Sequence, residues 1–135
     1  MVVPQYSVST NGIEFGVWHR EAVTGEGAID IVCHRGIDYH VTLGAGAHYE
    51  AGAHTRRMEG PSPDHRLSYR LYQDPGHSIE WGDRGYANTF PGGVSVRGAG
   101  TNQKHSLPVY GNIPASSVQV PPGSYNDTVL VTVHF

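Results

Sequence analysis

The sequence has few of the features that mark an enzyme, a membrane-spanning chain or a nucleic-acid-binding protein. It holds one cysteine, Cys33, in 135 residues, so no disulfide can form within the chain. That single thiol fits either a reducing compartment or a secreted chain with an unpaired cysteine. No apolar run approaches the ~20 residues that a spanning helix needs. Nine basic residues against twelve acidic ones give a net charge of −3, which predicts no nucleic-acid partner.

Motifs for catalysis and metal binding are also missing. There is no Gly-x-Ser-x-Gly elbow, and Cys33 falls on the inward face of an alternating segment, where we expect a small buried hydrophobic residue. Nine histidines are scattered, many of them in polar stretches, without the His-Glu-x-x-His spacing or the Cys-x-x-Cys pair of a zinc site. The sequence therefore predicts no catalytic residues, no metal site and no cofactor.

What the chain has is many glycine and proline residues, together with hydrophobic residues at every second position. Eighteen glycines and nine prolines leave little room for long helices. A weak first strand begins at Tyr6, is broken by Thr10-Asn11-Gly12 and resumes at Ile13. Clearer alternating faces predict strands within Ala28–Cys33, Tyr39–Leu43, Leu67–Leu71, Leu107–Val109 and Val129–Phe135.

The arrangement of these strands predicts the fold class. We expect Ala28–Cys33 and Tyr39–Leu43 to pair as a hairpin across the turn His34–Gly36. The long connection Gly44–Asp64 has room for a short edge strand. About seven short strands in one domain, residues 1–135, predict an all-β sandwich of immunoglobulin-like type, with a barrel as the alternative.

Five short motifs occur in a particular order: Arg57-Met58, Leu67–Asp74, Trp81–Asp83, Val109–Pro114 and Pro122–Val129. Together with the Ile13–Gly16 start and the strand that carries Cys33, this order resembles the spore coat protein U domain. That family includes subunits of archaic chaperone–usher pili, and the resemblance covers nearly the whole chain.

The resemblance implies an incomplete immunoglobulin-like β-sandwich that lacks its last strand. It implies a non-enzymatic structural subunit of a bacterial surface fibre, assembled by donor-strand complementation, with a role in attachment and biofilm formation. Such a subunit is secreted to the periplasm and held there by a chaperone. It then passes to an outer-membrane usher and joins neighbouring pilus subunits in a cell-surface fibre.

Two features depart from the family pattern. The first strand of the family commonly carries a cysteine that pairs with the one at the Cys33 position. Here that strand opens with Tyr6, so a disulfide worth about 2–4 kcal/mol is missing. A fibre subunit also carries an alternating apolar segment before its first strand, whereas only Met1–Gln5 precede Tyr6. We therefore expect either a shortened N-terminus or a tip subunit that accepts a strand and donates none.

The C-terminal segment is expected to border the groove that a donor strand fills. An unpaired sheet edge invites pairing with another chain, and chaperone–pilin complexes use this mode. The expected donor-strand groove is lined by Val129, Val131, Val133 and Phe135, with Ile13 and Phe15 from the first strand opposite. Ordinary core positions are the alternative, because periodicity does not separate a groove from a core.

Other functional classes remain open from the sequence. One is a self-contained lectin-like or adhesive binding module, or a tip adhesin domain. Tyr86 and Phe90 lie in a glycine-rich loop and either form an exposed adhesive patch or fold back as a minor core. Another is a coat protein that packs without strand exchange. A fibre subunit requires an open sheet, whereas the others require a closed one.

Overall fold

The computed structural model describes residues 6–13, 15, 16, 18, 21–49, 55–61, 65–114 and 121–135. These residues form eight strands and no helix, and thus no helix that could cross a bilayer is found in this part of the chain. The segment Met1–Gln5 lies outside the described residues. The strands are β1 (Tyr6–Asn11), β2 (Val23–Cys33), β3 (Asp38–Leu43), β4 (Arg56–Glu59), β5 (Arg66–Tyr72), β6 (Val96–Ala99), β7 (Lys104–Ile113) and β8 (Val131–His134).

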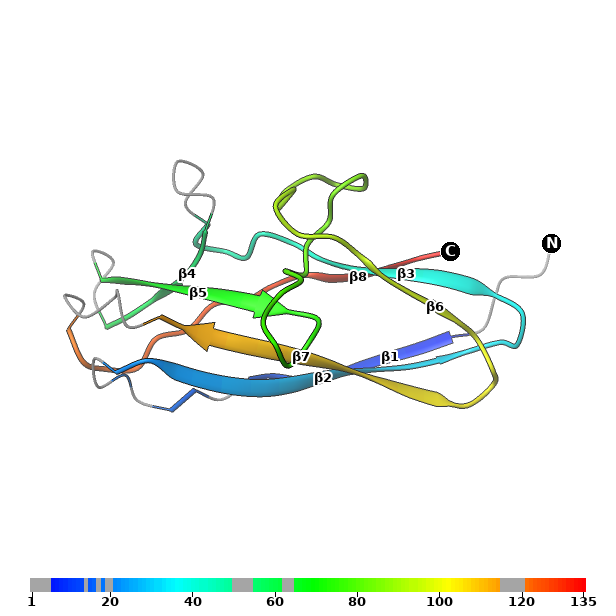
Figure 1. Cartoon of the computed structure of the whole chain (residues 1–135), viewed down its shortest axis with the longest axis horizontal. Helices are drawn as coiled ribbons and strands as arrows, with labels where there is room; N and C mark the ends of the chain where they lie inside the picture. The colour runs from blue at the N-terminus through cyan, green and yellow to red at the C-terminus, as the bar shows by residue number, and fades with distance from the viewer. Residues whose placement is uncertain are drawn as a thin grey trace.

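The strands form two antiparallel sheets that face each other (Figure 1). The larger sheet has the order β1-β2-β7-β5-β4, and the smaller one has the order β6-β3-β8. Alternate residues of each strand point into the shared core, as Ile31 of β2 and Val41 of β3 do, both of them completely buried. Two sheets around one core confirm the expected all-β, immunoglobulin-like sandwich.

The predicted hairpin between Ala28–Cys33 and Tyr39–Leu43 is wrong. β2 pairs with β1 and β7, whereas β3 pairs with β6 and β8. The turn after Cys33 therefore carries the chain from the large sheet to the small one. Alternation identifies the buried face of each strand, but either sheet can supply that face to the same core. The pattern alone does not say which strands are neighbours.

Other expectations from the sequence are confirmed. Cys33 is buried and unpaired, as a small hydrophobic residue of β2. The short edge strand expected within Gly44–Asp64 is β4, at the far edge of the large sheet. β2 and β7 are longer than the alternation indicated. In the added stretches Gly25 and Gly111 contribute no side chain, so the period-two pattern does not register them.

A buried arginine links the small sheet to the loop after β5. Arg56 is completely buried, and its guanidinium donates hydrogen bonds to the carbonyl oxygens of Gly44 (2.9 Å), Leu43 (3.2 Å) and Trp81 (2.7 Å). The indole N–H of Trp81 donates to the carbonyl of Val41 (2.9 Å). These bonds hold the loop, yellow-green in Figure 1, against strand β3.

Candidate functional site

The last strand of the small sheet has an open edge. Within the described part of the chain, β8 pairs with β3 and with no other strand. The Gly44 N–H donates to the Leu130 carbonyl (3.0 Å), so the even-numbered residues Leu130, Thr132 and His134 turn their backbone groups toward β3. The backbone N–H and C=O groups of Val131 and Val133 consequently point away from β3, along the open edge.

An apolar cavity lies directly beside this edge. Its volume is about 530 Å³, and it opens between the two sheets. β1, the edge strand of the large sheet, borders it with Thr10 and Asn11, while the segment leading into β8 borders it with Val129 and Val131. The apolar walls include side chains from both sheets: Ile29, Leu43, Leu67, Leu71, Val109 and Ile113. An edge with free hydrogen-bonding groups and an apolar cavity thus occur together.

The structure brings four of the expected groove residues to the cavity: Ile13, Phe15, Val129 and Val131. Val133 packs against the hydrophobic core without lining the cavity. Phe135 does not lie in the cavity, and it is 53% exposed. β8 ends at His134, so the strand geometry that would turn the next side chain inward stops before Phe135. The structure thus places two of the six expected groove residues, Val133 and Phe135, outside the cavity.

Beneath Ile13 and Phe15 lies a flat patch of backbone, which the sequence reasoning missed. Gly25 and Gly27 of β2 and Gly111 of β7 form this patch, called here the glycine shelf, and Gly25 lies directly opposite Gly111. A Cβ at Gly25 would come within 2.6 Å of the Ile13 side chain, and one at Gly111 within 2.6 Å of the Phe15 ring. A side chain at Gly25 or Gly111 would therefore displace Ile13 or Phe15 from its position.

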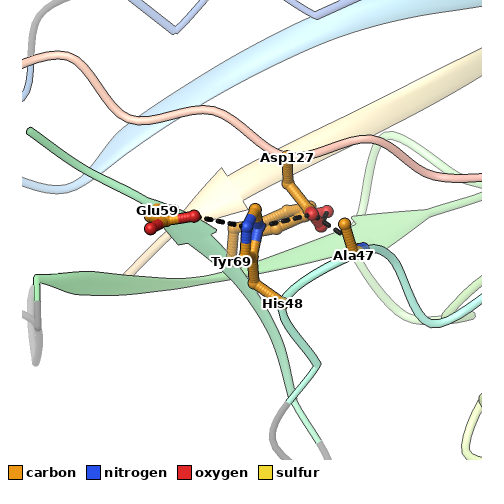
Figure 2. A network of polar contacts seen from close by, with 5 residues as sticks. All are labelled: Ala47, His48, Glu59, Tyr69 and Asp127. Carbon is orange, nitrogen blue, oxygen red and sulfur yellow. Dashed lines mark hydrogen bonds and ion pairs between the residues drawn. The ribbon is translucent and has the colours of Figure 1, made fainter. Parts of the chain in front are cut away.

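A network of polar contacts fixes the segment that leads into β8 (Figure 2). The Asp127 carboxylate is almost fully buried and accepts hydrogen bonds from the Ala47 N–H (2.9 Å) and from the Tyr69 hydroxyl, and it also contacts His48 Nδ1 (3.1 Å). The other ring nitrogen of His48 lies 2.6 Å from a Glu59 carboxylate oxygen. Burial, together with the adjacent Asp127, raises the pKa of the Tyr69 phenol.

The network joins elements of both sheets. Asp127 precedes β8, Tyr69 belongs to β5 and Glu59 to β4, and all are tied to the loop that follows β3. The backbone adds a reciprocal pair between Glu59 and Asn126 (2.8 and 2.9 Å). The sequence suggested only a turn at Asp127, because its partners lie 58 to 80 residues away and carry no local signal. The open edge of β8 is held in place by these side chains as well as by the ladder between β8 and β3.

The two aromatic residues considered as an adhesive patch behave differently. Phe90 is 2% exposed and lies under the Arg56 guanidinium, 4.0 Å from ring centroid to Cζ. The buried Asp83 carboxylate accepts the Phe90 N–H (2.7 Å) and so folds this part of the loop inward. Of the two alternatives for this loop, an exposed patch or a minor core, Phe90 follows the second. Tyr86 is half-buried against His134, with ring centroids 4.1 Å apart.

Among the residues with described positions, no three His, Cys, Asp or Glu side chains gather where they could hold a metal ion. Both ring nitrogens of His48, whose partner Asp127 lines the cavity, already contact carboxylates. Besides this network, the described residues present an apolar cavity and an open strand edge at this place.

Comparison with known proteins agrees with this geometry. Protein U of Myxococcus xanthus is 35% identical over 115 residues, which is 82% of this chain. The chain spans 60% of the length of that relative. A chain in the crystal structure of the CsuC–CsuE chaperone–tip adhesion subunit pre-assembly complex, from archaic chaperone–usher Csu pili of Acinetobacter baumannii, shares the fold. The TM-score is 0.72 at 20% identity, over 99% of this chain and 40% of that one.

A family model also matches nearly the whole chain. Residues 1–132 match the Spore Coat Protein U domain, which includes every described strand except the last two residues of β8. The same residues contain the five ordered motifs on which the resemblance was based. This chain belongs to the Spore Coat Protein U domain family.

Proposed function

We propose that this chain is a non-enzymatic structural subunit of a surface fibre assembled by the chaperone–usher route. It accepts an extended segment of another chain along the open edge of β8. The observation that carries this proposal is the coincidence of that edge with an apolar cavity. A strand added there gains main-chain hydrogen bonds from Val131 and Val133 and places alternate side chains in the cavity.

The chemistry of the edge defines the partner. It is an extended segment with apolar residues at every second position, because side chains alternate between the two faces of a strand. A periplasmic chaperone supplies such a segment first, and a neighbouring subunit delivered by the usher replaces it. The family match and the chaperone-bound complex that contains the structural neighbour support this sequence of partners. In this proposal the protein passes through the periplasm and then forms part of a cell-surface fibre, where it contributes to attachment and biofilm formation.

Binding of a synthetic peptide tests the proposal. The peptide is extended and carries apolar residues at alternate positions, and binding is followed by the fluorescence of Trp18, which lines the cavity and is 2% exposed. We expect Val131→Asp to weaken binding about 100-fold or more, since it places a charge where the donor side chains pack. Leu130→Asp is the matched control, because Leu130 is adjacent in sequence but 72% exposed.

Circular dichroism of both variants shows whether the sandwich remains folded. A wild-type chain that binds no such peptide would remove the proposal and favour a self-contained binding module. Equal loss of binding in the two folded variants would place the acceptor site elsewhere on the molecule.

A further inference from the structure

The walls of the cavity are built in two different ways. Over most of its surface the strands supply their own side chains, such as Leu43 and Leu67. Over the glycine shelf the strands supply none, and the space is filled from above by Ile13 and Phe15. The Phe15 ring lies against two glycines at once, 2.6 Å from a Cβ built on Gly111 and 3.3 Å from one built on Gly25.

Phe15 reaches this position on a segment outside the regular ladder. β1 ends at Asn11, and the described residues between Asn11 and Trp18 belong to no strand. Gly12 and Gly16 flank the segment, and Gly16 has a positive φ of 79°, which glycine adopts without strain. The segment returns to the groove at Trp18, whose N–H donates to the Gly123 carbonyl (2.9 Å). Packing on the shelf, rather than strand pairing, therefore places the Phe15 ring.

We propose that Phe15 is the specificity-determining residue of the groove. By filling the space above the glycine shelf, it sets the groove depth at this end and restricts the donor side chain that faces it to a small one. This inference rests on the proposed function, because it concerns the same groove. The new element is that Phe15 selects among donor segments by the size of one of their side chains.

The physical reason is that Phe15, next to Ile13, separates the donor from bare backbone. Truncating a side chain that a strand contributes leaves a cavity of the size removed, bounded by its neighbours. Truncating Phe15 leaves the space of an aromatic ring above Gly25 and Gly111, which have no side chain to fill it. A large donor side chain can occupy that space. The partner then restores the packing that is lost when the Phe15 ring is removed.

The test scans one peptide position at a time. Each inward position of the donor peptide is made Gly, Ala, Leu or Phe in turn, and binding to wild type and to Phe15→Ala is measured by Trp18 fluorescence. For wild type, we expect one position at which Gly or Ala binds better than Leu or Phe. For Phe15→Ala, the preference at that position should reverse, with the ratio of affinities changing roughly tenfold. The other positions should keep their ratios.

Two further variants complete the experiment. Phe15→Leu leaves a smaller space, is more certain to fold and should give an intermediate change in the ratio. Phe135→Ala makes the same chemical change outside the cavity and should leave every ratio unchanged. Peptide binding with the same size preference in wild type and both Phe15 variants would overturn this inference and leave the proposed function standing. Absence of binding by every peptide to wild type would overturn both.

Discussion

At the scale of single residues, the buried guanidinium of Arg56 joins separate parts of the core. It binds three backbone carbonyls and lies over the Phe90 ring, and burial lowers its pKa, although nearby Tyr69 and several carboxylates oppose that shift. A lysine ammonium cannot present the planar fork that reaches three carbonyls from one point.

We therefore expect Arg56→Lys to lower the free energy of unfolding by about 2–3 kcal/mol, which urea denaturation would measure. The control is Arg97→Lys, because the Arg97 side chain is 70% exposed and its pair with Asp38 spans 3.6 Å. That change should stay within about 0.5 kcal/mol. Similar losses for the two variants would mean that the carbonyl contacts of Arg56 do not stabilise the fold.

At the scale of elements, the turn after β5 depends on one carboxylate. Asp74 accepts hydrogen bonds from the backbone N–H groups of Ile79 (2.9 Å) and Ser78 (3.0 Å), and these bonds lower the pKa of Asp74. A pKa that is lower in the folded state gives stability that is fully present above the unfolded-state value of about 3.8. That stability is lost as the pH falls through the lower folded-state value.

Comparison with Asp74→Asn isolates this contribution. The amide keeps one acceptor oxygen but does not ionise. We expect the wild type to have the higher melting temperature at neutral pH, and the difference to close as the pH falls from about 5 to about 2. A difference that stays constant over this range would show that the carboxylate charge does not hold the turn.

The same scale shows what the sequence could predict. Ile29, Ile31 and Cys33 alternate in β2 and are all buried, so the spacing of these hydrophobic residues was enough to predict the inward face of the strand. The pairing of β2 with β7 instead of β3 was not legible, because both arrangements bury that face equally well. Chain topology is decided by contacts between segments far apart in the sequence, and period-two patterns contain no information about them.

The residues that line one side of the cavity could be predicted from the sequence, but the glycine shelf could not. Val129 and Val131 followed from alternation and the family resemblance, and both line the cavity. Gly25, Gly27 and Gly111 carry no side chain to read, and their role appears only when Ile13 and Phe15 are placed above them. Likewise, the contacts of Asp127 with Ala47 and His48 join segments that no local motif connects.

At the scale of the whole molecule, the two sheets are unequal, with five strands in one and three in the other. A donor strand on β8 would make the small sheet four-stranded and cover the cavity. Because this binding site exists only in the folded state, the donor binds the folded chain and not the unfolded one. Ligand binding to the folded state alone raises stability by RT ln(1 + [L]/Kd). At a peptide concentration one hundred times Kd this is about 2.7 kcal/mol, or roughly 10 °C in melting temperature for a domain of this size.

We expect the melting temperature to rise with the logarithm of peptide concentration and to keep rising above saturation of the fluorescence signal, as this linkage requires. A peptide with proline at a position whose N–H must pair with β8 is the control, since proline has no such donor. It retains the apolar side chains, so the difference between the two peptides measures strand addition separately from simple filling of the cavity. If both peptides raise the melting temperature equally, the peptide binds only by filling the cavity with apolar side chains, and its backbone does not pair with the open edge of β8.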